Sequence, residues 1–345
     1  MSEADVIKIA SDCLQQKINF VSKMGGGGNS KVYHVICPAQ EYAVKFYFQH
    51  PSDSRDRLGI EFKSLSFLWE QGLRVIPRPV TLSLEHQCAF YEFIKGTPPG
   101  RDISQKDIDG AVYFLDILRN FSAGAASLNF SGASEAFFSA KDIVNSLKVR
   151  LKRFRLEDNT GEHIALREYL QNDFLPLLET IEAWSKKYLI GQGVLWGQEL
   201  PEQYRTLSPS DFGFHNALRT SAGSMVFLDF EYFGWDDPTK LVSDFLWHPA
   251  MNMTEDLKMY FVYRMSMIFG NDPYFKARLK GVFSLFGLKW CLILLNEFIP
   301  TDLQRRDFAR SQAKNKTAVR LEQLVKAKRM SEKIKMIYKD FPYGS

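Results

Sequence analysis

Three polar residues follow one another at short intervals near the middle of the sequence. Asp211 and Asn216 lie five residues apart in LSPSDFGFHNAL, and Asp229 ends the apolar run VFLD thirteen residues later. A carboxylate can accept a hydrogen bond from a hydroxyl group and orient it for attack, whereas amide and carboxylate oxygens are ligands that Mg²⁺ prefers. The spacing predicts a catalytic base, Asp211, beside a metal site of Asn216 and Asp229. The alternative is an ordinary turn followed by a strand that a surface Asp caps.

A lysine and a glutamate form a second candidate pair. Lys45 lies in the predicted strand YAVKFY, and Glu61 lies sixteen residues later among apolar positions of a predicted helix. A strand lysine held by a helix glutamate is the ion pair that directs the lysine toward the α- and β-phosphates of ATP. Two plainer alternatives remain open, a lysine that reaches water from a strand edge and a solvated helix glutamate.

The glycine-rich segment GGGGNS comes before the strand of this lysine. Glycine has no side chain, so the backbone can approach a phosphate closely, although a surface turn gives the same pattern. Read with the ion pair, the segment predicts a phosphate-covering loop. Its expected members are Gly26, Gly27, Gly28, Asn29 and Ser30.

The elements that must position these residues are of two kinds. Residues 18–48 and the later run VIPRPVTLSLEHQCAFYEFIKG are rich in β-branched and aromatic residues and predict strands. Between them, RLGIEFKSLSFLWEQG has the apolar spacing of a helix. After the turn cluster TPPG, helical patterns dominate, with a strand-rich interlude near 193–230. We therefore expect an α+β fold with a β-rich ATP-binding lobe, residues 1–95, and a helical lobe, residues 96–345, that carries the catalytic loop and the acceptor site.

Composition limits the classes of function. The chain has 345 residues, of which 45% are hydrophobic and 24% charged, so it can bury a core and general disorder is not expected. The net charge of +4 is too small to indicate a nucleic-acid partner. The four cysteines form no CxxC pair, which argues against a disulfide framework or a zinc site. The basic C-terminal segment is typical of a solvated amphipathic helix, with binding to an acidic surface as the alternative.

Membrane insertion and secretion are not expected either. The most apolar segment, residues 283–299, is interrupted by Lys289, Asn296 and Glu297, which favours a buried helix over a membrane span. The N-terminal sequence MSEADVIKIASDCL lacks the basic start and apolar core of a signal peptide. Together with the unpaired cysteines, this predicts a cytoplasmic protein.

These motifs resemble the aminoglycoside phosphotransferase and choline kinase family, which shares the protein-kinase fold. The resemblance covers the N-terminal lobe and continues to about residue 249. It implies that Asp211 is the catalytic residue, that Asn216 and Asp229 bind the metal, and that Lys45 and Glu61 anchor ATP. It thereby agrees with the residue types and spacing described above.

Further segments carry the resemblance. DFEY at 229–232 is similar to choline and ethanolamine kinases, whereas DDP at 236–238 is closer to the Gly-Asp-Pro of antibiotic kinases. Asp244 resembles a family aspartate that supports the catalytic loop. CAFYEFIKG looks like the last strand and hinge, which implies that backbone groups at Glu92, Phe93 and Ile94 bind adenine.

One position departs from the family. The family usually has His two residues before the catalytic Asp, and this sequence has Pro209 there. In the family that His supports the metal-binding turn and does not react. The change therefore bears on the packing of the loop more than on its chemistry.

The expected function is ATP-dependent transfer of the γ-phosphoryl group to a hydroxyl of a small molecule, such as an amino sugar, a sugar or a choline-like alcohol. Mg²⁺ is the expected cofactor, with ATP and the hydroxyl acceptor as partners. Two alternatives use the same residues. One is a kinase-like enzyme that modifies a protein, and the other is an inactive nucleotide-binding regulator, for which Pro209 is the support.

Overall fold

The chain folds into two compact units. The computed structural model describes residues 2–25, 30–49, 55–100, 102–124, 130–154, 159–309 and 315–344. Unit 1 consists of Met1–Pro99, Phe214–Phe233 and Gln304–Ala313, and unit 2 consists of Gly100–Gly213, Gly234–Leu303 and Lys314–Ser345. Two later segments of the chain thus join the N-terminal unit. The division of labour between an ATP-binding and an acceptor-binding lobe stays a prediction.

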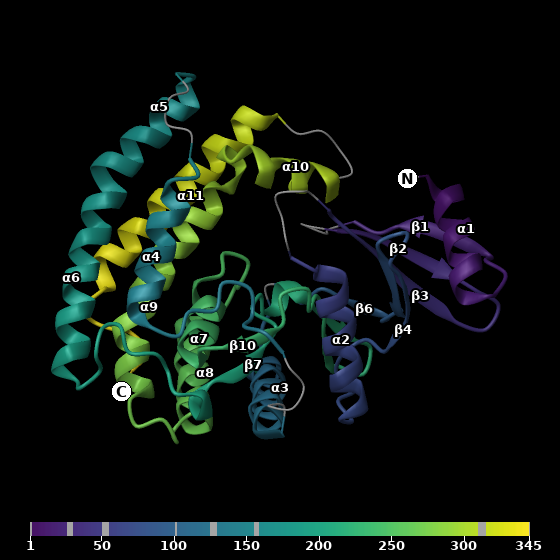
Figure 1. The fold of residues 1–345 in the computed structure, drawn as a ribbon, viewed down its shortest axis with the longest axis horizontal. Coiled ribbons are helices and arrows are strands. Elements are labelled where there is room, and N and C mark those ends of the chain that lie inside the picture. The colour runs from purple at the N-terminus through teal and green to yellow at the C-terminus, as the bar shows by residue number, and fades with distance from the viewer. Residues whose placement is uncertain are drawn as a thin grey trace. The chain divides into compact units, whose positions relative to one another are not determined.

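An antiparallel sheet of five strands forms the centre of unit 1, in the order β1-β2-β3-β5-β4 (Figure 1). Its strands and flanking helices are α1 (Glu3–Leu14), β1 (Phe20–Lys23), β2 (Ser30–Ile36), β3 (Glu41–Tyr47), α2 (Arg57–Glu70), β4 (Pro79–Ser83) and β5 (Cys88–Glu92). The predicted strands and the predicted helix at 57–72 agree with these elements.

The two faces of this sheet have different partners. Val6, Ile9 and Ala10 of α1 pack with Val35, Val44 and other buried side chains on one face. Successive side chains of a strand point to opposite faces, so Lys45 and Tyr47 lie on the other face. There, Lys45 contacts Glu61 of α2.

A small three-stranded sheet completes unit 1. It consists of β6 (Gly96–Thr97), β8 (Ala217–Thr220) and β9 (Met225–Phe227), in the order β6-β8-β9. The 3-10 helix η4 (Phe214–Asn216) directly precedes β8 in the chain. Ala217 pairs with Phe227 in the β8–β9 hairpin. The N–H of Leu228 donates to the carbonyl of Asn216 at 2.8 Å. The hairpin thereby brings Asn216 and the segment that starts at Asp229 to the same end.

Unit 2 is mainly helical. Its longer helices are α3 (Gln105–Gly124), α4 (Ala140–Leu151), α5 (Gly161–Glu168), α6 (Leu175–Gly191), α7 (Pro238–Trp247), α8 (Glu255–Ile268), α9 (Phe275–Leu294) and α11 (Lys316–Ile337). The π-helix η2 (Tyr169–Phe174) joins α5 to α6, and η3 (Glu202–Tyr204) and η5 (Leu295–Phe298) are 3-10 helices. The helix α10 (Pro300–Ala309) begins in unit 2, and its residues from Gln304 onward belong to unit 1. The long helix α9 packs against α4, α6, α7 and α11 (Figure 1).

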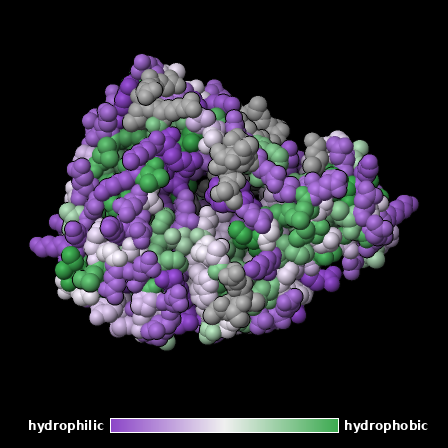
Figure 2. Space-filling view, viewed as in Figure 1, coloured by the Kyte–Doolittle hydropathy of each residue, from purple (hydrophilic) through white to green (hydrophobic). Residues whose placement is uncertain are grey.

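The apolar helix α9 and the turn after it explain the hydrophobic segment in the sequence. Within the described residues, Phe275–Phe298 is the one helical stretch long and apolar enough to cross a membrane, and 89% of its most apolar window is buried in the fold. Its Lys289 is buried as well and is paired with a carboxylate, Asp244. This supports the prediction of a buried helix. The face shown in Figure 2 is largely hydrophilic, with hydrophobic residues interspersed among polar ones.

A two-stranded ribbon in unit 2 leads into and away from the predicted catalytic segment. Its strands are β7 (Thr206–Ser208) and β10 (Gly234–Asp236), which pair antiparallel with Gly234 opposite Ser208. The segment that precedes α4 runs parallel to β10, because Ala133 N donates to Trp235 O at 2.8 Å and Trp235 N donates to Ser131 O at 3.0 Å. The two segments lie so close that Gly234 has no room for a side chain. A Cβ there would lie 2.6 Å from Ala133 N and would also overlap the carbonyl of Ser131.

We predict that Gly234→Ala lowers the free energy of unfolding by about 2 kcal/mol or more, because backbone atoms must move to admit the methyl group. Urea denaturation gives the value. Gly132→Ala, in the segment that pairs with β10, is the matched control, since its added Cβ would approach no atom closer than 3.7 Å. That control should change stability by less than about 1 kcal/mol. Equal effects of the two substitutions would contradict the close approach.

Candidate active site

The predicted ion pair of unit 1 is formed and buried. Lys45 Nζ lies 2.6 Å from Glu61 Oε2, and the two residues are only 7% and 3% exposed. Tyr47 OH donates to the same oxygen at 2.9 Å, and the N–H of Phe230 donates to Oε1 at 3.2 Å. Both carboxylate oxygens of Glu61 are therefore fixed, so Glu61 is a rigid anchor for Lys45 and no solvated helix residue.

Two more carboxylates approach the same lysine. Asp229 Oδ1 lies 2.6 Å and Glu231 Oε2 lies 3.5 Å from Lys45 Nζ. Arg57 Nε lies 3.5 Å from Glu231 Oε1. Lys45, Arg57, Glu61, Asp229 and Glu231 thus form a cluster of two cations and three carboxylates. We call these five residues the Lys45 cluster.

Burial and the neighbouring charges shift the pKa values of Lys45 and Asp229 in the Lys45 cluster. Burial alone would lower the pKa of Lys45, but attraction by Asp229, Glu61 and Glu231 outweighs it and raises the pKa well above its usual value. For Asp229, burial and the two other carboxylates outweigh the attraction of Lys45 and raise the pKa to about 7. The side chain of Asp229 is still 31% exposed. A positive charge added next to Asp229 would therefore stabilise the ionised form of this carboxylate.

A divalent cation fits this end of the β8–β9 hairpin. Asn216 offers an amide oxygen, and Asp229 offers a half-exposed carboxylate at the same end of the hairpin. Oxygen donors of these two kinds suit Mg²⁺, and the excess negative charge favours a cation. Asp229 has a φ of 67°, which is the left-handed region and unusual for a residue with a side chain.

The predicted catalytic residue belongs to a tight turn in unit 2. The N–H of Asp211 donates to Pro209 O at 2.9 Å, across Ser210, whose φ is 67°. A hydrogen bond from residue i+2 to residue i closes a γ-turn, and its positive-φ form is rare and strained. On the other side of Asp211, the ring of Phe212 stacks between those of Phe114 and Phe245, at 5.3 and 5.7 Å between centroids.

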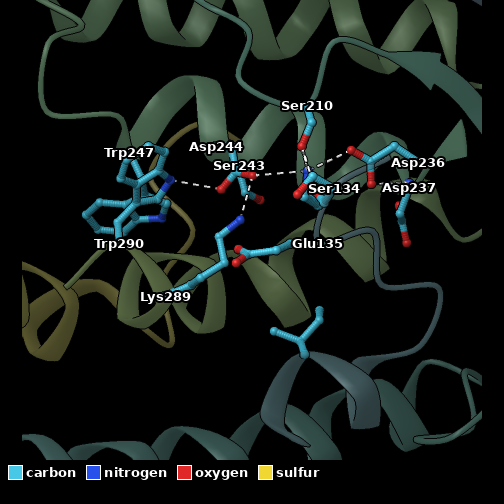
Figure 3. Close-up of polar contacts among 12 residues, drawn as sticks. Ser134, Glu135, Ser210, Asp236, Asp237, Ser243, Asp244, Trp247, Lys289 and Trp290 are labelled. Carbon is cyan, nitrogen blue, oxygen red and sulfur yellow. Dashed lines mark hydrogen bonds and ion pairs between the residues drawn. The ribbon is translucent and has the colours of Figure 1, made fainter. Parts of the chain in front are cut away.

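A second buried charge cluster lies behind this turn (Figure 3). Lys240 Nζ lies 2.7 Å from Asp236 and 3.5 Å from Asp244. Asp244 also accepts from Lys289 Nζ and from Trp290 Nε1, each at 2.8 Å. We call Asp236, Lys240, Asp244 and Lys289 the Lys240 cluster. Its two cations balance its two carboxylates.

The structure accounts for the predicted site residues unequally. Lys45, Glu61 and Asp229 meet in unit 1, Asn216 lies at the same hairpin end as Asp229, and Asp211 lies in unit 2. Gly26, Gly27, Gly28 and Asn29 fall outside the described residues. Ser30 is buried at the start of β2, where it pairs with Tyr47.

The predicted hinge follows β5. The N–H groups of Glu92 and Phe93 already donate to Arg78 O and Glu41 O, at 2.9 and 3.2 Å. The ring of Phe93 stacks on His34 with 3.7 Å between centroids. Of the three predicted residues, Ile94 is therefore the better candidate for an N–H donor to adenine.

Sequence reasoning missed several residues that the structure brings to these sites. Tyr47 lies two positions after Lys45 in β3, so the period of two of a strand was a usable signal for Tyr47, whereas Glu231 lies in a turn after Asp229 and has no such signal. No local signal marks Lys240 or Ser210. Trp290 and Asn296 of the apolar segment are packed, since Trp290 donates to Asp244 and Asn296 accepts from Arg150 at 3.3 Å.

Residues 21–256 match the model of the phosphotransferase enzyme family. The chain belongs to this family. The prediction of a phosphotransferase is thereby confirmed. A comparison with curated proteins gave no match.

Solved structures show the fold. A spectinomycin phosphotransferase with bound ADP and spectinomycin is 16% identical, with a TM-score of 0.59 over 93% of this chain and 98% of its own. The choline kinase of Streptococcus pneumoniae is 13% identical, with a TM-score of 0.59 over 96% and 99%. An aminoglycoside phosphotransferase in complex with gentamicin is 19% identical, with a TM-score of 0.62 over 99% of both chains. The predicted α+β fold of the protein-kinase-like class is confirmed.

The raised pKa of Asp229 predicts how the stability of the nucleotide-free phosphotransferase depends on pH. The pKa is about 7 in the folded protein, above the ordinary 3.8, so the folded state binds this proton more tightly than the unfolded state does. The contribution of Asp229 to the free energy of unfolding is therefore lost as the pH rises from the ordinary pKa of 3.8 to the folded-state pKa of about 7. Urea denaturation at about pH 5 and about pH 8 should show a smaller loss in Asp229→Asn than in wild type. Asp256→Asn, at an exposed position of α8, should keep the wild-type loss, and parallel behaviour of both variants would refute the assignment.

We also predict strong coupling between Lys45 and Glu61. Lys45→Met leaves buried carboxylates without their cation and should cost about 3–5 kcal/mol of stability, whereas Glu61→Gln leaves Lys45 paired with Asp229 and should cost less. The double variant should be more stable than the sum of the single losses predicts, by more than about 1 kcal/mol. Lys148→Met and Glu182→Gln, at an exposed pair 2.9 Å apart, form the control cycle and should couple by less than about 1 kcal/mol. Additive losses at Lys45 and Glu61 would mean that the two residues do not act together.

Proposed function

We propose that this phosphotransferase moves the γ-phosphoryl group of ATP to a hydroxyl group of a small molecule. The Lys45 cluster is the observation that carries the proposal. A buried lysine held by Glu61 of α2 and by Asp229 after β9 is the arrangement that ATP-dependent phosphoryl transfer requires. Family membership supports the same reaction class.

In unit 1, Lys45 would bind the phosphates of ATP. Its raised pKa keeps the ammonium charged, and its hydrogen bond to Glu61 keeps it attached to α2. Gly26, Gly27, Gly28, Asn29 and Ser30 would cover the phosphates with backbone N–H groups. The hinge at Glu92, Phe93 and Ile94 would bind adenine, with Ile94 supplying the N–H donor.

Mg²⁺ would be held by Asn216 and Asp229. When bound, Mg²⁺ neutralises part of the negative charge on the phosphate oxygens. The surplus carboxylate of the Lys45 cluster supports this assignment, because Asp229 shares Lys45 with two other carboxylates and would accept a second cation. Lys45 would then turn from Asp229 toward the phosphates and remain attached to Glu61.

In unit 2, Asp211 would accept the hydrogen bond of the acceptor hydroxyl and take its proton as the new P–O bond forms. The bond between the γ-phosphorus and the bridging oxygen breaks, and ADP leaves with the electron pair. The protein contributes mainly position and charge, because this reaction needs little covalent assistance.

The acceptor class follows from the relatives. The solved structures named above include a spectinomycin phosphotransferase, a choline kinase and a complex with gentamicin. We therefore propose an amino sugar, a sugar or a choline-like alcohol as the acceptor. The four cysteines are free, which suits a reducing compartment such as the cytoplasm.

The decisive test replaces Asp211 with Asn, which keeps the shape of the side chain and removes its charge. Phosphate transfer to a panel of amino sugars, sugars and amino alcohols should fall by about 10²- to 10⁴-fold, because general-base assistance is lost. The affinity for ATP, measured by calorimetry, should change by less than about threefold, since unit 1 binds the nucleotide.

The control is Asp256→Asn at an exposed position of α8, which should keep the wild-type rate. A second arm measures ATP binding with Mg²⁺ and with a chelator. Near-full transfer by Asp211→Asn would disprove the role of Asp211. ATP affinity that does not depend on Mg²⁺ would disprove the metal assignment.

A further inference from the structure

The turn that carries Asp211 needs support from outside itself. Ser210 has a φ of 67°, which costs a residue with a side chain about 1–3 kcal/mol and persists only when its surroundings impose it. The preceding residue, Pro209, has no N–H group to contribute. Within the turn, the backbone bonds are Ser210 N to Ser208 Oγ and Asp211 N to Pro209 O, both at 2.9 Å.

The side chain of Ser210 supplies that support, because it has partners on two other elements. Its hydroxyl donates to Ser134 O at 2.8 Å and accepts from Lys240 Nζ at 3.0 Å. Lys240 lies in the first turn of α7, and Ser134 lies in the segment that pairs with β10. Figure 3 shows Ser210 next to Ser134, with Asp244 on one side and Asp236 on the other.

Lys240 is a rigid support because its ammonium group is buried and paired. The residue is 1% exposed, its ammonium group donates to Asp236 at 2.7 Å and to Ser210 at 3.0 Å, and it lies 3.5 Å from Asp244. Removing an ammonium group from water is costly, so the group stays where both carboxylates meet it. Asp244 is itself fixed by Lys289 and Trp290 of α9.

We propose that Lys240 is a positioning residue for phosphoryl transfer, which acts through the hydroxyl of Ser210 to hold the turn that aims Asp211. This inference rests on the proposed role of Asp211. Lys240 and Ser134 fix the turn on its N-terminal side, and the stacked ring of Phe212 fixes it on the C-terminal side. The polar contacts of Ser210 and the aromatic contacts of Phe212 therefore hold the residues on both sides of Asp211.

Two substitutions at Ser210 separate the hydroxyl from the backbone strain. Ser210→Ala removes the hydroxyl and keeps the strain, whereas Ser210→Gly removes the hydroxyl and relieves the strain. Hydrolysis of Mg-ATP with water as acceptor gives kcat and KM for each variant. We expect both variants to lose kcat by about tenfold or more, with KM for ATP within about twofold. Wild-type kcat in Ser210→Gly would overturn the proposal, because strain relief alone would then suffice.

The lysine is tested with a charge-balanced double variant. Lys240→Met with Asp236→Asn removes one cation and one carboxylate, and leaves Asp244 paired with Lys289. It should reduce kcat as Ser210→Ala does, and adding Ser210→Ala should cause no further loss, because both act through one contact. Multiplicative losses would overturn the proposal.

The matched control removes another ion pair at the start of α7. Arg278 of α9 lies 2.6 Å from Asp237, the N-cap residue of α7. Arg278→Met with Asp237→Asn should lower stability and keep kcat. An equal loss of kcat in this control would assign the effect to general destabilisation and reject a specific role of Lys240.

An exchange measurement keeps the proposal testable without turnover. Mass spectrometry of amide hydrogen exchange should show faster exchange in the peptide that contains Asp211 in Ser210→Ala and in the charge-balanced variant, because the bond from Asp211 N to Pro209 O opens. Unchanged exchange in both would overturn the inference whatever the activity. A different result would refute the proposed function and leave this inference standing. In that result the Ser210→Ala and charge-balanced variants lose protection, while Asp211→Asn is as active as wild type.

Discussion

The burial of a single positive charge organises unit 1. Lys45 is a buried residue of the five-stranded sheet, so its ammonium group is tolerable only where carboxylates replace water. The carboxylates come from α2 and from the segment after β9, and Asp229 is 184 residues away in the chain. The requirement to neutralise Lys45 thus joins three distant segments, and the same requirement holds the lysine ready for an anionic ligand.

The two buried charge clusters differ in the balance between their cations and carboxylates. The Lys240 cluster has two cations and two carboxylates, and it needs no further partner. The Lys45 cluster has three carboxylates and two cations, and its member Asp229 has a raised pKa and a partly exposed side chain. This difference is the reason for proposing a cation site at Asp229 and a supporting role for the Lys240 cluster.

Local patterns predicted the strands of the N-terminal sheet, the helix α2 and the pairing of Lys45 with Glu61, because they depend on local physics. The β-branched and aromatic content placed Lys45 on a strand, and the apolar spacing placed Glu61 on a helix, although a solvated Glu61 stayed open. Lys240 could not be found in this way, since a lysine in the first turn of a helix is ordinarily solvated. Its burial follows from the packing of α7 against α9, which is a long-range property. The same holds for residues 214–233, which join unit 1 because β8 pairs with β6, more than a hundred residues earlier.

Each unit contains a residue with a strained backbone that contacts a buried lysine. Ser210 and Asp229 both have a φ of 67°, and each is held by a buried lysine, Lys240 and Lys45. Strain of about 1–3 kcal/mol at each position opposes folding, and a charge-assisted hydrogen bond is of comparable size. Each lysine can therefore impose a conformation that the local sequence disfavours. A glycine at either position would remove the strain and also the side chain that the lysine grips. The chain retains side chains at both positions, so the fixed direction of Asp211 and of Asp229 depends on lysines that lie far away in sequence.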